Sequence, residues 1–244
     1  MVAAFYPLAF AAEQVGGAET DVRNLTPPGV EPHDLELSGG DVRAIADADL
    51  VFYLRGFQPS LEDAIDSTSA HAVDLLGAAV TDPHLWLDPA RYAASARRIA
   101  KELGRGAEAE PFVAKLRVLD DEFRQGLSHC ERNEIVASHA AFAHLARYGL
   151  RQVAITGITP EAEPTPRDLE AVVRQVRAVG ATTVFFETLV SPRLAETVAR
   201  EVGAKTAVLN PLEGLTPEEV AAGEDYFSIM RENLATLREA LECR

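Results

Sequence analysis

The sequence predicts an α/β protein with two lobes, each built on a parallel sheet, that are joined by a long helical segment. Short apolar runs alternate with helical patterns toward both ends of the chain, which favours parallel sheets with helices on both faces. Between these parts, from Pro89 to residue 128, the pattern is helical. The 244 residues suffice for one large domain or for two lobes of about 120 each. We expect lobes at 1–105 and 129–244 and a connecting helix within 106–128.

The first lobe is predicted to contain four short strands and at least two helices. The first helix covers residues 7–15 and ends at Gly16-Gly17, and Ser38 caps a second helix that continues to Ala46. The expected strands are residues 2–6, 21–25, 50–54 and 72–75.

The connecting region is predicted to be helical, and the second lobe is predicted to alternate strands and helices as the first lobe does. Residues 90–103 and 110–127 form two helices, the second with an apolar face. Later helices start near Ala140, at Thr165-Pro166 and at Ser191-Pro192, the last two because Thr or Ser before Pro is typical of a helix start. The last helix covers 225–243, and the expected strands are 134–137, 152–156, 182–186 and 205–209.

The composition is that of an ordinary soluble globular protein, 47% hydrophobic and 25% charged. A formal net charge of −15 argues against nucleic acid as a partner, because phosphate binding needs a basic surface. No apolar run approaches the roughly 18 residues of a membrane span. The first residues lack the basic segment and cleavage site of a signal peptide, so we expect a cytosolic protein or a mature form.

Three of the six histidines lie in settings suited to metal binding. His84 stands in a stiff turn, because Pro83 restricts the backbone before it and Asp88 with Pro89 starts a helix soon after it. His33 follows Pro32 after a turn-rich loop, and His139 follows the strand at 134–137. Ligands of open α/β sheets bind outside the carboxyl ends of strands, so the three imidazoles can converge there. Three His with a carboxylate or water is a common zinc-ligand set.

Glu213 is the candidate fourth ligand, because it lies just after the last strand of the second lobe. Glu161, Glu163 and Glu187 compete with it, and we expect the first two to order a loop or to contact the ligands. Water can also complete such a site. The remaining histidines, His71, His129 and His144, are expected to be structural or solvated.

The two cysteines, Cys130 and Cys243, leave two alternatives open. They are separate buried thiols, or they form one disulfide that ties the last helix to the start of the second lobe. The disulfide requires an oxidising compartment.

Motifs typical of enzymes are missing from the sequence: it has no HExxH, GxSxG, GxxxxGK[ST] or GxGxxG. We therefore expect a binding module and not an enzyme. A zinc-dependent hydrolase is the alternative, since three His with an open position is also a hydrolytic site.

Three motifs of the chain are distinctive together: Gly-Val-Glu-Pro-His33-Asp34, Asp82-Pro-His84-Leu-Trp-Leu-Asp88-Pro and Ser138-His139-Ala-Ala-Phe. With these motifs the chain resembles the metal-binding solute receptors of ABC importers, the zinc and manganese substrate-binding proteins, and the stretch Glu161-Ala-Glu163-Pro is also similar to that family. The resemblance extends nearly from end to end. It implies two Rossmann-like lobes bridged by one long rigid helix, with the metal between them and with His33, His84 and His139 as ligands.

The resemblance also implies function and location. Zinc receptors of this kind have His at the third position, where manganese receptors have a carboxylate, so His139 favours Zn²⁺. The implied protein is an extracytoplasmic monomer, periplasmic or lipid-anchored, that delivers Zn²⁺ to a membrane permease, and its Cys130–Cys243 disulfide is favoured. A manganese receptor and an adhesin of the same fold remain alternatives.

The chain departs from the family's pattern in two places. It lacks a His-rich loop before the second motif, where Gly77 and Val80 are close to Asp82. Asn210 stands where the family has an Asp ligand, which makes Glu213 the nearest carboxylate.

Because the imidazoles must be neutral to bind zinc, the zinc affinity should fall when the pH drops below about 6.5.

Overall fold

The computed structural model describes residues 1–77, 80–160 and 164–244, and the chain divides into two compact units. The first unit comprises Met1–Val118 and Leu212–Tyr226, and the second comprises Leu119–Pro211 and Phe227–Arg244. Each unit holds a four-stranded sheet in which every neighbouring pair of strands is parallel. The predicted α/β class with two parallel sheets is confirmed. The rigidity of the connecting helix and the predicted lobe boundaries stay predictions.

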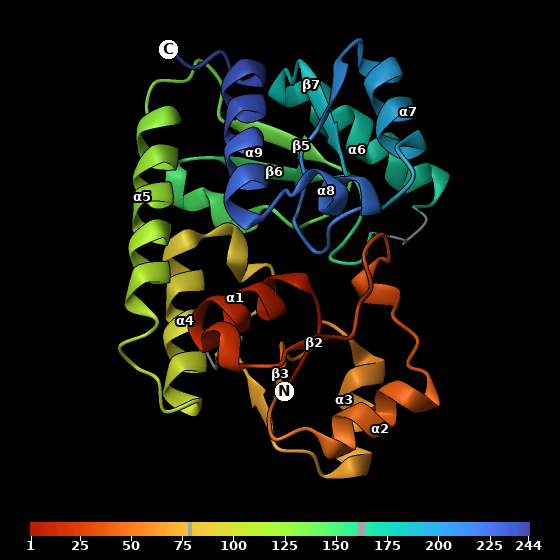
Figure 1. Ribbon diagram of the computed structural model, residues 1–244. Helices are drawn as coiled ribbons and strands as arrows, with labels where there is room; N and C mark the ends of the chain where they lie inside the picture. The colour runs from red at the N-terminus through yellow and green to blue at the C-terminus, as the bar shows by residue number, and fades with distance from the viewer. Residues whose placement is uncertain (78–79, 161–163) are drawn as a thin grey trace. The chain divides into compact units, whose positions relative to one another are not determined.

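The sheet of the first unit has the strand order β2-β1-β3-β4. The connection from β1 to β2 runs in one direction along the sheet, and the connections from β2 to β3 and from β3 to β4 run in the opposite direction. Because such connections are right-handed as a rule, the helix after β1 lies on one face of the sheet and the helices after β2 and β3 lie on the other. Accordingly α1 packs against α4, and α2 packs against α3 (Figure 1). The elements are β1 (Val2–Ala3), α1 (Tyr6–Gly16), β2 (Arg23–Asn24), α2 (Gly39–Asp47), β3 (Val51–Tyr53), α3 (Pro59–Thr68), β4 (Ala72–Asp74), α4 (Pro89–Glu102) and α8 (Pro217–Ala222).

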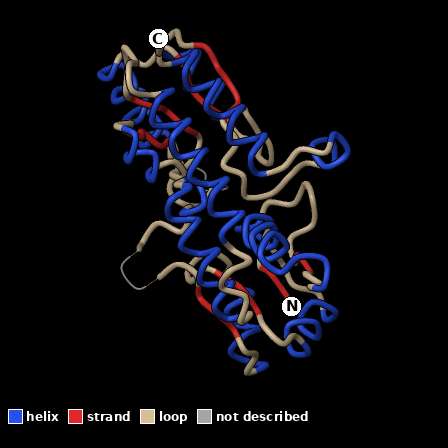
Figure 2. The backbone as a smooth tube through the Cα atoms, turned by 60° about the vertical axis from the view of Figure 1, so that its left-hand side comes forward, coloured by secondary structure: helices blue, strands red, loops and turns tan. Residues whose placement is uncertain are grey.

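The sheet of the second unit repeats this topology with the order β6-β5-β7-β8, and α6 and α7 pack together. Its core is mainly β-branched, with Val136, Val153, Val176, Val184 and Val198 buried. Helices and short strands alternate along the backbone (Figure 2). The elements are β5 (Glu134–Ala137), β6 (Arg151–Ala154), α6 (Pro166–Val179), β7 (Thr183–Phe186), α7 (Arg193–Val202) and β8 (Lys205–Val208).

Two long helices contain two of the three boundaries between the units, and the third boundary lies between Pro211 and Leu212. Helix α5 (Glu110–Gly126) fits the prediction for 110–127, and α9 (Tyr226–Ala240) fits the prediction of a last helix. Cys130 and Cys243 form a disulfide within the second unit, where the two residues also make an antiparallel bridge. Among the described residues, no helix is both long enough and apolar enough to span a membrane.

Two predicted helix starts are wrong. No α-helix starts near Ala140, because the Ala140 N–H donates to the Gly157 carbonyl at 2.8 Å and Gln152 donates to the His139 carbonyl. Only a 3-10 helix, Ala143–Tyr148, follows. Helix α7 begins one residue later than predicted, with Pro192 at its N-cap in helical backbone geometry, so Ser191 does not cap it.

Two helices, α3 and α8, are missing from the sequence-based expectations. Helix α3 starts after Gln58, whose side chain makes no capping hydrogen bond, and α8 has only six residues. Helix α8 carries the signal that correctly located α6, a Thr before Pro with an acidic residue at the third helical position. Thr216 and Glu219 form this capping box.

Candidate metal centre

The turn that presents His84 is held by one carboxylate. Oδ1 of Asp82 accepts from the His84 backbone N–H at 3.0 Å and lies 2.8 Å from His84 Nδ1. Because an ionised carboxylate only accepts, Nδ1 carries the proton, which leaves Nε2 as the nitrogen that would bind a metal. Asp88 then caps α4, accepting from the N–H groups of Ala90 and Arg91, as predicted. The imidazole of His84 is fully buried, and the contact with Asp82 fixes its orientation.

His33 lies in a single 3-10 turn, Pro32–Asp34, after β2. The Glu31 side chain accepts from the His33 N–H at 3.1 Å, which caps this turn. The imidazole packs on Phe57, with ring centroids 4.2 Å apart, and its side chain is 5% exposed. The His33 ring is therefore positioned both by its backbone and by an aromatic neighbour.

Glu213 belongs to the first unit although it follows the last strand of the second. Leu212 before it has a φ of 57°, a left-handed conformation that is uncommon outside glycine. The segment is anchored by the Gly29 N–H, which donates to the Leu215 carbonyl at 2.8 Å. Gly29 has a φ of 81°, and a Cβ there would lie 3.2 Å from Pro217 Cδ, so this close approach requires glycine. The result is a completely buried carboxylate at Glu213.

His33, His84 and Glu213 converge within the first unit. Glu213 Oε1 lies 2.9 Å from His84 Nε2 and 3.4 Å from His33 Nε2. Zinc bonds of about 2.0–2.1 Å in a tetrahedron place neighbouring ligand atoms about 3.3 Å apart. The spacing of these three atoms therefore fits a bound zinc ion.

Aromatic side chains surround this half of the centre. Phe57 and Trp86 contact His84 with centroid separations of 5.9 and 5.3 Å, and Phe5 packs on both of them. Trp86 is completely buried. Such walls exclude water and lower the local dielectric, which strengthens the attraction between a metal ion and the Glu213 carboxylate.

His139 in the second unit is held as His84 is held in the first. Its Nδ1 lies 2.7 Å from Glu187 Oε1, and the Ser138 hydroxyl donates to the same oxygen. Gln152 Nε2 donates to the His139 carbonyl. The carboxylate places the proton on Nδ1, so Nε2 keeps the lone pair that a metal needs.

The topology explains why His139 and Glu187 meet. His139 lies two residues after β5 and Glu187 directly follows β7, and these neighbouring strands flank the point where the strand order reverses. Ligand sites of open α/β sheets lie at this point, outside the carboxyl ends of the strands. Glu187 was predicted only as a competing fourth ligand, and the structure places it on the Nδ1 side of His139.

The other residues singled out from the sequence lie elsewhere. Glu161 and Glu163 fall outside the described residues, as do Ala78 and Ala79 at the shortened loop. Asn210 donates its backbone N–H to the Asn233 side chain at 2.9 Å. His71 is exposed, His129 contacts the Ser128 hydroxyl, and His144 lies in the 3-10 helix after His139.

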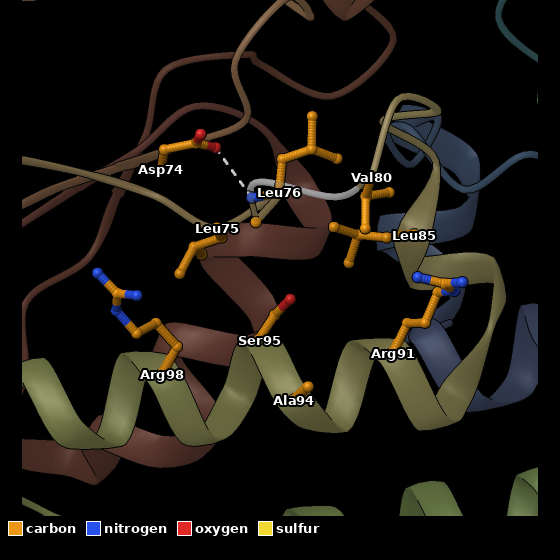
Figure 3. A pocket seen from close by; sticks show the side chains of 10 residues that line it. Asp74, Leu75, Leu76, Val80, Leu85, Arg91, Ala94, Ser95 and Arg98 are labelled. Carbon is orange, nitrogen blue, oxygen red and sulfur yellow. Dashed lines mark hydrogen bonds between the residues drawn. The ribbon is translucent and has the colours of Figure 1, made fainter.

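A separate cavity of about 240 Å³ lies beside α4 in the first unit. Arg91, Ser95 and Arg98 project from one face of α4 toward leucine side chains (Figure 3). Neither His33, His84 nor Glu213 lines it. This cavity is therefore distinct from the candidate metal centre.

Comparisons with known proteins identify the family of this chain. Residues 1–240 match the family model described as "ZnuA: Zinc-uptake complex component A periplasmic". The zinc-binding protein AdcA of Streptococcus pyogenes serotype M1 is 33% identical over 98% of this chain, which spans 55% of that relative, about half its length. The high-affinity zinc uptake system protein ZnuA of Bacillus subtilis is 31% identical, with 99% of this chain and 87% of the relative covered.

Solved structures of zinc-binding and metal-transporting proteins have a similar fold. The Zn(II)-bound ZnuA-like domain of Streptococcus pneumoniae AdcA has a TM-score of 0.84 and 34% identity, covering 99% of this chain and 98% of that one. The laminin-binding protein Lmb of Streptococcus agalactiae, described as a bifunctional protein with adhesin and metal transporting activity, has a TM-score of 0.88 and 32% identity, covering 98% of each chain. With a family match over nearly its whole length and a site suited to zinc, this chain belongs to the family of the periplasmic zinc-uptake complex component A.

Proposed function

We propose that this protein is a receptor that captures Zn²⁺ outside the cytoplasm and delivers it to the membrane permease of an ABC-type importer. Zinc is the cargo of this receptor. Its proposed ligands are His33, His84 and Glu213 from the first unit and His139 from the second.

The spacing of the three first-unit ligands is the observation that carries the proposal. Each offers a ligand atom, and these atoms lie within 4.8 Å of one another. Their side chains are at most 5% exposed, so a dication would be bound away from water. His139 is proposed as the fourth ligand because its Nε2 keeps a lone pair and its side chain is likewise buried.

The ligand chemistry favours Zn²⁺ over Mn²⁺. Imidazole suits zinc, whereas manganese prefers carboxylate, carbonyl and water oxygens. The proposed set contains three imidazoles and a single carboxylate. A manganese receptor would more commonly replace one imidazole with an oxygen ligand.

The disulfide supports a location outside the cytoplasm, because disulfides persist in oxidising compartments. The family description names a periplasmic component of an uptake complex, which supports a permease as partner. The mode of attachment, periplasmic or by a lipid anchor, and the monomeric state belong to the same proposal.

Metal binding by the chelator-stripped protein tests the function. One tightly held Zn²⁺ per chain is expected in a competition titration, with tighter binding of Zn²⁺ than of Mn²⁺. His139→Ala is expected to weaken zinc binding strongly. Preference for Mn²⁺, or zinc affinity that does not respond to His139→Ala, would contradict the proposed ligand set.

The similarity to the laminin-binding protein of Streptococcus agalactiae favours adhesion as a second candidate function. Surface plasmon resonance with immobilised laminin tests it. Saturable laminin binding by the zinc-loaded protein would support the adhesin, whereas no response at micromolar protein would exclude it.

A further inference from the structure

We propose that Glu187 is the positioning residue of the second unit, whose buried charge makes His139 a stronger ligand and is compensated by the arriving metal ion. This inference rests on the proposed function, because it assumes that His139 binds zinc. It concerns how the affinity of that site is produced.

The geometry gives Glu187 control of the imidazole. Its Oε1 accepts from His139 Nδ1 at 2.7 Å and from the Ser138 hydroxyl. The same strand end holds the backbone, since the Ser138 N–H donates to the Phe185 carbonyl at 3.1 Å. Carboxylates that accept from the second nitrogen of a ligating histidine fix its tautomer and raise its basicity, and their loss typically costs about 10–100-fold in metal affinity.

The carboxylate also holds a negative charge without a cationic neighbour. The Glu187 side chain is 1% exposed, and among the residues that the structure describes it forms no ion pair with Lys or Arg. Its Oε2 is buried and has no hydrogen-bond partner in the described part of the chain. Burying an uncompensated charge costs free energy. A dication on the far side of the His139 ring would relieve this cost.

Asp120, in the same unit, is a second buried carboxylate, but within the described ranges of the chain it has cationic neighbours that Glu187 lacks. Its carboxylate accepts from Arg147 at 2.9 and 3.0 Å, from Arg124 at 2.8 Å and from Tyr148 at 2.8 Å. Its charge is fully compensated by the protein, so it should serve folding alone. Glu187 and Asp120 therefore predict opposite results on neutralisation.

The test compares Glu187→Gln, Glu187→Asp and Asp120→Asn with the wild type. Zinc Kd is measured by chelator competition, and the Tm of the metal-free protein by calorimetry. Glu187→Gln keeps the acceptor but removes the charge, so we expect a Kd raised about 10–100-fold with a metal-free Tm that is unchanged or higher. Asp120→Asn should lower the metal-free Tm and leave the Kd within about twofold.

Glu187→Asp keeps the charge on a shorter side chain and tests the role of charge if the Gln variant misfolds. The zinc Kd of Glu187→Asp should lie between the values of the wild type and Glu187→Gln. If the Gln variant does not fold, the Kd of Glu187→Asp should lie within about 10-fold of the wild-type value. A Kd of Glu187→Gln within twofold of wild type, or a parallel loss of Tm and affinity, would overturn the inference while leaving zinc binding intact. Failure of the wild type to bind zinc would instead refute the proposed function and this inference with it.

Discussion

The two units share one sheet topology and one way of holding a histidine, but they differ in what stands around it. In the first unit, Asp82 orients His84, and a second carboxylate, Glu213, lies 2.9 Å from the other ring nitrogen. In the second unit, the carboxylate beside His139 belongs to Glu187 and lies on the Nδ1 side. The first unit thus brings one carboxylate together with two imidazoles. The second unit has one imidazole, and its carboxylate lies on the Nδ1 side of the ring, away from Nε2.

The two units therefore differ in what they would contribute to a metal site under the proposed ligand set. A half-site with two imidazoles and a carboxylate can hold a dication by itself, although incompletely. A single oriented imidazole cannot, so under the proposed ligand set His139 should add affinity to an ion that is held mainly by His33, His84 and Glu213. The hydrophobic cores of the two units differ too. Aromatic rings surround His84 in the first unit, whereas valines predominate in the buried cluster of the second unit.

The largest expected effect is that of removing a first-unit ligand. His84→Ala should raise the zinc Kd by more than 100-fold, beyond the range of outer partners, because it removes a ligand atom and leaves Glu213 buried without its neighbour. Chelator competition measures this, with the exposed His71→Ala as the matched control. A larger loss for His139→Ala than for His84→Ala would break the proposed division of work.

Truncation of a core side chain should destabilise the two units to different extents. Trp86→Ala should cost about 3–5 kcal/mol of unfolding free energy, because a completely buried aromatic ring leaves a large cavity. Val184→Ala in the second unit should cost only about 2 kcal/mol. Urea unfolding of the metal-free protein, followed by circular dichroism, gives both values. Equal costs would show that the aromatic core has no special weight in stability.

The two orienting carboxylates should differ in importance. The Asp82 side chain is 20% exposed and that of Glu187 is 1% exposed, so solvent partly screens the charge of Asp82. Asp82→Asn should therefore raise the zinc Kd less than Glu187→Gln does, by about 10-fold or less. Both variants are titrated under the same conditions. The reverse order would indicate that exposure does not decide the strength of these partners.

The smallest effect concerns acid stability, which the second unit should show through Asp120. Burial alone would raise the pKa of Asp120, but hydrogen bonds from Arg147, Tyr148 and Arg124 outweigh it and lower the pKa from 3.8 to about 2. The resulting stabilisation, about 1–2 kcal/mol, is complete above pH 3.8 and is lost as the pH falls toward 2. Asp120→Asn should flatten unfolding free energy against pH in this window. The exposed Asp121→Asn should keep the wild-type slope.

Local signals in the sequence predicted much of this architecture. Alternating apolar runs indicated the parallel sheets, and the Asp88 and Thr165 caps located α4 and α6 correctly. The proline-framed turns pointed to His33 and His84, because proline restricts backbone geometry without help from distant residues. The strand at 134–137 was predicted with its observed bounds, but most strands were predicted too long, since the ends of short strands depend on pairing with neighbours.

Long-range folding settled the rest. The sequence offered four glutamates for the fourth ligand position, and the proximity of Glu213 to His33 and His84 depends on a segment that leaves the second sheet and returns to the first unit through Leu212 and the Gly29 contact. The role of Glu187 likewise required β5 and β7 to be neighbours, which strand patterns do not reveal. Residue types and local caps follow from nearby covalent chemistry, whereas the convergence of distant carboxylates on histidines follows from topology and packing.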